Sequence, residues 1–219
     1  MFNKSIFDAK ANEYKKIFLK NGPLFPVKWE MMENFNTYWQ PSVDPFMASY
    51  QSVLIESTDS WSQPVIEAKQ AMTMMIQYNE DMVKSMFSDL FNEKLEIGGR
   101  IERFLFHCDA IREDMNAEKV RLDSHCHDKR MICIYLMCRY PGVYCSFEYK
   151  EFRSVLQAMD GRSIPTPYES DRYFKNMRNL ARFLWADPGF SEGCISYLST
   201  QVIELQPVEI AVDFCFRIG

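Results

Sequence analysis

The sequence predicts a mainly α fold, an irregular multi-helix domain with at most one short strand or hairpin near residues 143–149. Three observations support this class. Apolar residues recur at three- and four-residue spacing along much of the 219-residue chain, aromatic residues make up 15% of it, and glycine occurs only 8 times. Such a composition favours packed helices over the turn-rich strands of a sandwich or barrel.

In the N-terminal quarter, the sequence predicts three helices separated by breaks that contain proline. Gly22 ends the first, over residues 2–19, as a left-handed cap. The second covers residues 27–39. Asp44 caps the third, which opens at Pro45. The apolar residues expected to share one face of the first helix are Phe2, Ile6, Ala9, Tyr14, Ile17 and Phe18.

The middle of the chain predicts its longest helix, over residues 60–91, followed by one over residues 95–115. Residues 127–139 are apolar on all sides in their central part, which predicts a buried central helix. The segment Val143–Tyr149 is the strand candidate, because it is short, aromatic and β-branched at its start.

The C-terminal part predicts a helix around residues 152–159, one that Ser170 caps, and two short helices over residues 191–205 and from 207 onward. Tyr173, Met177, Leu180 and Leu184 line one face of the helix from Ser170. Because no repeat or linker interrupts the pattern, we expect a single helical domain over residues 1–219. A weak subdivision falls between N-terminal helices at 1–57 and a helical core at 58–219, near the loop at 56–61.

Composition narrows the class of protein. The net charge of −5 argues against a broad non-specific nucleic-acid binder, although it allows a local basic face. Seven cysteines without a C-x-x-C pair are typical of a reducing cytosol. Since no apolar run has the length of a signal peptide or membrane span, we expect a soluble, cytoplasmic protein with no membrane partner.

Catalytic motifs are missing, which predicts a non-enzymatic protein without a cofactor. The sequence has no phosphate-binding loop, no dinucleotide fingerprint and no nucleophile elbow. The densest polar group is the run His125-Cys126-His127-Asp128, with His107-Cys108-Asp109 upstream. Adjacent residues on a helix point about 100° apart, so no metal site is expected. A nucleophile at Cys126, assisted by His125 or His127, stays an alternative.

A basic stripe on the helix from Ser170 is the candidate binding surface. Its charges are spaced by three, three and four residues, so they share one side of the helix. The candidate DNA-binding residues are Arg172, Lys175, Arg178 and Arg182, with Lys150 and Arg153 nearby. The candidate base-stacking residues are Tyr144, Tyr149 and Trp185. The alternative is a solvated face paired with Glu and Asp.

A family resemblance covers residues 86–185. A series of short runs resembles the region that precedes the AAA+ module in McrB-like restriction ATPases. They are Met86–Glu93, Ile97 with Arg100–Phe104, Asp128–Leu136, Arg139–Tyr144 and Phe147–Phe152. The closing Asp213–Phe216 is similar to the segment that leads into that module. The GTP-binding loop of the family is absent, and no nuclease motif is present.

The resemblance implies a recognition or targeting domain of a restriction or phage-defence system. It further implies DNA as a ligand, and an AAA+ ATPase module or a nuclease subunit as a partner. The alternative is a protein–protein adaptor without a nucleic-acid role, which the acidic composition favours.

Overall fold

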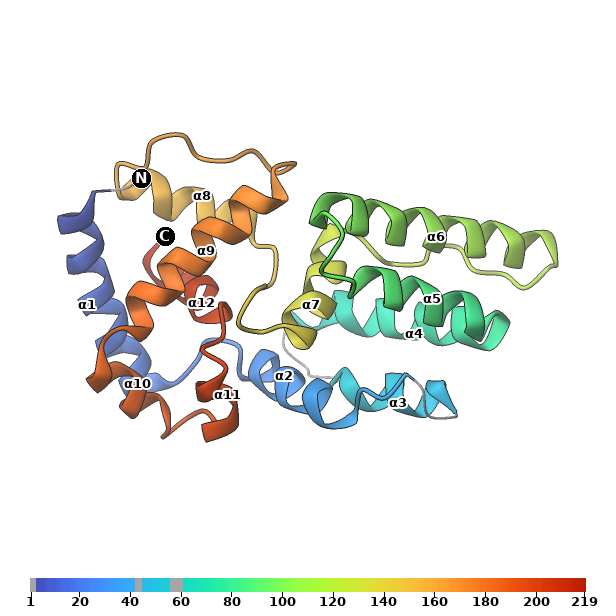
Figure 1. Cartoon of the computed structure of the whole chain (residues 1–219), viewed down its shortest axis with the longest axis horizontal. Helices are drawn as coiled ribbons and strands as arrows, with labels where there is room; N and C mark the ends of the chain where they lie inside the picture. Colours follow the sequence, from blue (N-terminus) through green and yellow to red (C-terminus); the bar gives the residue numbers. More distant parts are fainter. Residues whose placement is uncertain (1–2, 42–44, 56–60) are drawn as a thin grey trace. The chain divides into compact units, whose positions relative to one another are not determined.

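The computed structural model describes residues 3–41, 45–55 and 61–219. Within these ranges the chain forms twelve α-helices and no strand, which confirms the predicted class (Figure 1). It divides into two compact units. Unit 1 combines Met1–Trp29 with Tyr140–Gly219, and unit 2 is Glu30–Arg139. Residues 56–60, in the loop expected as a weak boundary, lie outside the described residues, and the single-domain organisation stays a prediction.

Unit 1 is built around its last helix. Its helices are α1 (Lys4–Asn21), the start of α2 (Pro26–Tyr38), α8 (Tyr149–Ala158), α9 (Ser170–Trp185), α10 (Pro188–Cys194), α11 (Thr200–Glu204) and α12 (Glu209–Ile218). The first seven residues of α12 are all buried, and α12 packs against α1, α8 and α9. Figure 1 shows α12 behind α9, and α1 at the left of the picture. The two ends of the chain therefore share one core.

Local sequence explains the limits of α1. The Asn3 side chain accepts hydrogen bonds from the N–H groups of Ser5 and Ile6, and Gly22, with a φ of 72°, ends the helix. The buried face consists of Phe7, Ala11, Tyr14 and Phe18. The predicted face correctly included Tyr14 and Phe18. However, it included Ile6, Ile17 and the exposed Ala9 in place of Phe7 and Ala11, while Phe2 lies outside the described residues.

Unit 2 contains the rest of α2 together with α3 (Phe46–Val53), α4 (Gln63–Tyr78), α5 (Glu80–Leu90), α6 (Ile97–Ala117) and α7 (Lys129–Arg139). Residues 131–138 of α7 are all buried, as expected for a central helix. Helices α4 and α6 both pack on α7 and on each other. Asp44, the expected cap of the third helix, lies outside the described residues.

The long helix expected over residues 60–91 is two helices. Asn79 separates α4 from α5, with a φ of −151° that no helix residue adopts. Its N–H donates to the carbonyl oxygen of Met75, and its side-chain oxygen accepts from the N–H of Met82. One asparagine therefore ends α4 and caps α5. Asparagine favours this role because its short side chain competes for backbone groups.

No strand forms at residues 143–149, because side chains satisfy the backbone there. The N–H of Ser146 donates to Oε2 of Glu209 at 2.8 Å. The Tyr173 hydroxyl donates to the carbonyl oxygen of Ser146 at 2.9 Å and accepts from the N–H of Glu148 at 3.2 Å. Residues 144–148 are an irregular segment, and α8 begins at Tyr149. Hydrogen bonds from the backbone to buried polar side chains outweigh the local β propensity here.

Helix α10 begins earlier than the helix predicted over residues 191–205. Asp187 and Pro188, directly after α9, start it. The Asp187 side chain accepts from the N–H of Phe190, and Pro188 occupies the first helical turn. The helix expected over residues 191–205 is therefore two helices, α10 and α11, separated by residues 195–199. Ser199 caps α11. Among the described helices, none combines the length and the apolar character needed to cross a bilayer.

Candidate functional site

Helix α9 presents an apolar face to the core of unit 1 and a cationic face to solvent. Tyr173, Met177, Leu180 and Leu184 are completely buried, as predicted. On the other side, Arg172, Lys175 and Arg182 are exposed and Arg178 is half-buried. The spacing therefore separated the two faces of this helix correctly.

The four cations of α9 border two different hollows. Arg172 and Lys175 line a hollow of about 320 Å³ together with Arg162, Ser163 and Asn176. Arg178 and Arg182 line another, of about 490 Å³, beside residues 204–206. Arg178 also has a structural role, since its Nη1 donates to the carbonyl oxygen of Val143 at 3.1 Å.

The hollow that Arg162, Arg172 and Lys175 line, called here the cationic hollow, gathers three basic side chains on unit 1. No carboxylate is among the described residues that line it. Glu169 lies at its edge and accepts from Arg172, whose Nη2 also donates to Ser163 Oγ at 3.0 Å. The N–H of Thr166 and then the Arg172 guanidinium lower the pKa of Glu169 to about 2. This carboxylate stays ionised, so it holds Arg172 in place while offsetting part of its charge.

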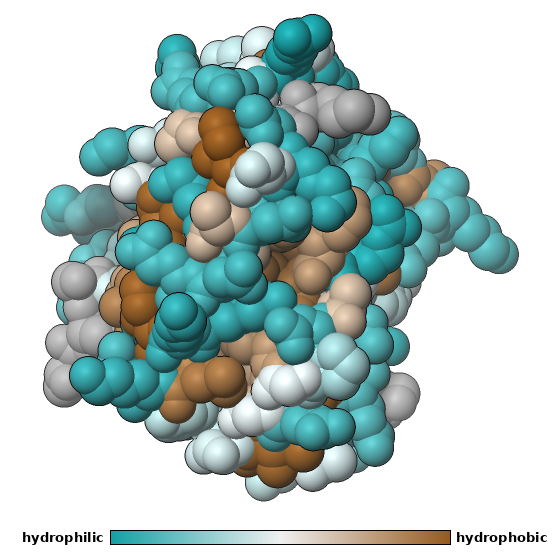
Figure 2. All heavy atoms as spheres, turned by 90° about the vertical axis from the view of Figure 1, so that its left-hand side faces the viewer, coloured by the Kyte–Doolittle hydropathy of each residue, from teal (hydrophilic) through white to brown (hydrophobic). Residues whose placement is uncertain are grey.

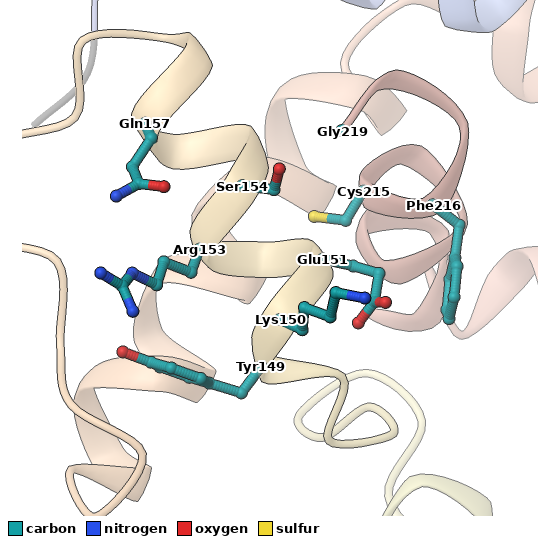
Figure 3. A pocket seen from close by; sticks show the side chains of 9 residues that line it. All are labelled: Tyr149, Lys150, Glu151, Arg153, Ser154, Gln157, Cys215, Phe216 and Gly219. Atoms are coloured by element: carbon teal, nitrogen blue, oxygen red, sulfur yellow. The ribbon is translucent and has the colours of Figure 1, made fainter.

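Lys150 and Arg153 lie on α8 and line a third hollow, of about 540 Å³ (Figure 3). Figure 3 shows Arg153 extending on the Tyr149 side of α8, whereas Lys150 and Glu151 extend toward α12. This hollow mixes charges and includes Phe216 and Cys215. It is therefore less suited to a polyanion than the cationic hollow.

Two of the three aromatic residues predicted to stack on bases belong to the core. Tyr144 is 6% exposed and packs edge-on against Phe174, with ring centroids 5.0 Å apart. Trp185 is 7% exposed and its Nε1 donates to the carbonyl oxygen of Pro207. Burying these rings stabilises unit 1 and removes their faces from any ligand. Tyr149 is half-buried, and its hydroxyl donates to the carbonyl oxygen of Pro165.

Two exposed aromatic rings at or near α9 were not among the predicted base-stacking residues. Tyr168, just before α9, is 92% exposed, and Phe183, on α9, is 45% exposed. The guanidinium carbon of Arg182 lies 5.7 Å from the Phe183 ring centroid. The periodicity of α9 could have identified Phe183, because this residue falls outside the spacing of the buried face.

A second group of polar residues lies in unit 2. Metal binding was not expected because His125, Cys126 and His127 were placed at the entry of a helix. Helix α6 ends at Ala117 and α7 starts at Lys129, so these residues lie in the connection. Cys126 has a φ of 55°, and the two imidazole centroids are 5.8 Å apart. One ligand atom from each of His125, His127 and Cys108 lies within 4.8 Å of the others.

No family model, curated protein or solved structure matches this chain. The resemblance to McrB-like ATPases therefore stays a prediction. The two units nevertheless differ in charge. Unit 1 contains 14 basic and 12 acidic residues, whereas unit 2 contains 11 basic and 18 acidic residues. The acidic balance of the chain thus belongs to unit 2, and unit 1 carries a small positive excess.

Proposed function

We propose that unit 1 binds DNA through the exposed cations of α9 and the preceding loop, and that the protein is a non-enzymatic recognition domain. The cationic hollow is the observation that carries this proposal. Arginine forks match the geometry of phosphate oxygens, and lysine adds a mobile point charge. The charge difference between the units supports the same assignment, since a basic surface on an acidic chain needs a place where acidic residues are sparse.

Exposed aromatic rings give this surface a second means of contact. Phe183 and Tyr168 flank the cations and replace Tyr144 and Trp185 as the residues proposed to stack on a base. Phosphate contacts fix the position of a nucleic acid, whereas ring contacts favour unpaired or displaced bases. In keeping with the resemblance, we propose an AAA+ ATPase or nuclease subunit of a restriction or defence system as the partner that acts on the bound DNA.

A charge-reversal experiment tests the DNA proposal. The variant K175E/R182E changes two exposed residues and spares Arg178, which holds the Val143 carbonyl. Binding of a fluorescein-labelled duplex of about 20 base pairs is followed by anisotropy over a salt series. We expect affinity to fall about tenfold or more, and the salt slope to lose about two units.

A variant with the same change in charge serves as the control. K16E/K94E alters two exposed lysines on α1 and in the connection before α6, and it should bind DNA nearly as the parent chain does. Equal losses in both variants would indicate a non-specific effect of net charge. Unchanged binding by K175E/R182E, or a parent chain that binds no duplex, would refute the proposal.

The adaptor alternative rests on exposed apolar residues near the ends of α1 and α10. Leu19, Leu24, Ile195 and Tyr197 are each about two-fifths exposed or more, and the Tyr197 hydroxyl donates to the carbonyl oxygen of Leu19. On the face that carries α1, however, apolar side chains lie in separate small groups among polar ones (Figure 2). A stable protein interface needs a more continuous apolar centre, so the cationic surface is the better supported site.

A further inference from the structure

Three side chains with soft or borderline ligand atoms converge inside unit 2. Cys108 comes from the middle of α6, and His125 and His127 come from the connection between α6 and α7. The thiol sulfur and one nitrogen of each imidazole all lie within 4.8 Å of one another. Cys108 and His127 are buried, and the His125 side chain is 13% exposed. This cluster has no part in the proposed DNA surface, which belongs to unit 1.

The backbone of the connection brings the two histidines to the same side. Residues i and i+2 of a regular helix diverge, but Cys126 adopts a left-handed conformation with a φ of 55°. Its N–H donates to the Ser124 hydroxyl at 3.1 Å, which stabilises the turn. The side chain of Asp128 then accepts from the N–H of Met131 at the start of α7. His127 is therefore fixed between a tight turn and a helix start.

The hydrogen bonds identify a lone pair on each ring. His127 Nδ1 contacts the carbonyl oxygen of His125. Because a carbonyl only accepts, Nδ1 carries the proton and Nε2 carries the lone pair. His125 Nδ1 accepts from the N–H of His127 at 3.0 Å, so its proton is on Nε2. Each neutral imidazole thus offers one nitrogen in the form that a metal ion binds.

The protonated nitrogens have the partners that metal-binding histidines use. A ligating histidine usually donates its other N–H to a backbone carbonyl or a carboxylate, which fixes the ring. His127 donates to the carbonyl of His125. His125 Nε2 lies 3.4 Å from Oδ1 of Asp109, which Arg112 also contacts. A backbone carbonyl therefore orients the His127 ring, and the Asp109 carboxylate orients the His125 ring.

We propose that Cys108, His125 and His127 form a binding site for a zinc-class divalent ion, with a solvent oxygen as the fourth ligand and the Cys108 thiol proton released to solvent on binding. One sulfur and two imidazole nitrogens suit this ion, whereas calcium and magnesium require oxygen ligands. The ion takes the place of the Tyr135 hydroxyl, which lies 2.9 Å from His127 Nε2, and of the His127 N–H at His125 Nδ1. Binding connects α6 to the start of α7, so it stabilises the folded form of unit 2.

Cobalt binding tests the site directly, because a thiolate ligand gives Co²⁺ a charge-transfer absorption band. The full chain, with any affinity tag removed, is reduced, stripped with a chelator and titrated with Co²⁺ and then Zn²⁺. We expect about one equivalent of Co²⁺ to bind with this band, and Zn²⁺ to displace it. H125Q and C108S should lose the band, and D109N should bind about tenfold more weakly.

C126S is the matched control, since Cys126 lies between the two histidines but its sulfur lies near Ser124 at 3.7 Å. It should keep the band and the stoichiometry. The His125 side chain is 13% exposed and accepts from the His127 N–H, so circular dichroism of stripped H125Q checks that it folds, and this variant keeps the test decisive even if C108S does not fold. A stripped chain that binds no Co²⁺, or a band that persists in both C108S and H125Q, would overturn the proposal.

Discussion

The Nζ atom of Lys28 lies 2.6 Å from Oε1 of Glu209, and both side chains are almost fully buried. Ser146 completes the group through its N–H and its hydroxyl, which both donate to Glu209. Burial raises the pKa of Glu209, and the Lys28 ammonium and Ser146 oppose this shift. The group joins the start of α2, the irregular segment before α8 and the first turn of α12, so it aligns three distant parts of unit 1.

The variant K28M should destabilise unit 1 strongly, because it leaves a buried carboxyl without its cation. We expect the free energy of unfolding to fall by about 3–5 kcal/mol, as when one partner of a buried pair is removed. Urea denaturation followed by circular dichroism measures the change. K28M/E209Q, which removes both charges, should recover part of the loss. A decrease below about 1 kcal/mol in K28M would contradict this role.

Arg178 and Lys175 should separate stability from binding. R178A loses the hydrogen bond to the Val143 carbonyl, which should cost about 1–3 kcal/mol of stability. K175A changes an exposed side chain, and its effect on stability should stay within about 0.5 kcal/mol. Both should weaken duplex binding in the anisotropy assay. Equal melting temperatures for the two variants would show that Arg178 has no structural role.

Glu169 should make the start of α9 sensitive to acid. Its pKa in the folded chain is lowered to about 2, from a usual value of 4.5. A depressed pKa contributes stability above pH 4.5, and this contribution is lost as pH falls toward 2. E169Q should therefore melt at a lower temperature than the parent chain at pH 7, and the difference should shrink below pH 4.5. Thermal melts at pH 7, 4 and 2.5 measure this, and a constant difference would exclude the mechanism.

The tyrosine pair in unit 2 should respond unequally to loss of its hydroxyls. The Tyr50 and Tyr135 hydroxyl oxygens are 2.9 Å apart, and the latter also reaches His127 Nε2. In the metal-free chain, Y135F leaves the Tyr50 hydroxyl and His127 Nε2 without this partner, whereas Y50F affects only the Tyr135 hydroxyl, which keeps its contact with His127. We expect a cost of about 1–3 kcal/mol for each atom, so Y135F should be clearly the more destabilising in urea denaturation. The reverse order would contradict this arrangement.

Gly161 should not tolerate a side chain. Just beyond the end of α8, Asp160 lies in the left-handed region, at a φ of 54°, and the N–H of Gly161 donates to the carbonyl oxygen of Leu156. A Cβ atom on Gly161 would lie 2.6 Å from that oxygen. G161A should therefore lose about 1–3 kcal/mol. G189A is the control, since its nearest neighbour would be 3.4 Å away, and its melting temperature should change little.

Apolar periodicity predicted most of the helices, because burial sets both the spacing and the approximate limits of each element. It identified the buried face of α9 and the burial of α7. It failed where one polar side chain outweighed the pattern. Asn79 divides a continuous apolar region into two helices, and Glu209 and Tyr173 satisfy a segment that has the composition of a strand.

The candidate sites were less predictable, because they depend on tertiary contacts. Tyr144 and Trp185 have aromatic side chains of the kind that stack on bases. In the fold, however, Tyr144 packs against Phe174 and Trp185 against Phe190, and both are buried. The cluster of Cys108, His125 and His127 depends on the backbone conformation of Cys126, which spacing cannot reveal. Arg162 completes the cationic hollow from a loop that no helical pattern connects to α9.

The division of unit 1 between the two ends of the chain has a consequence for synthesis on the ribosome. Residues 30–139 are contiguous, so unit 2 can fold as soon as they emerge. Helix α1, by contrast, receives a large part of its cover from α12, and the Tyr14 hydroxyl donates to Asp213, 199 positions later. Until translation reaches that point, the apolar face of α1 is uncovered. The nascent chain therefore exposes the apolar face of α1 until α12 is made, and a chaperone that binds early would cover this face.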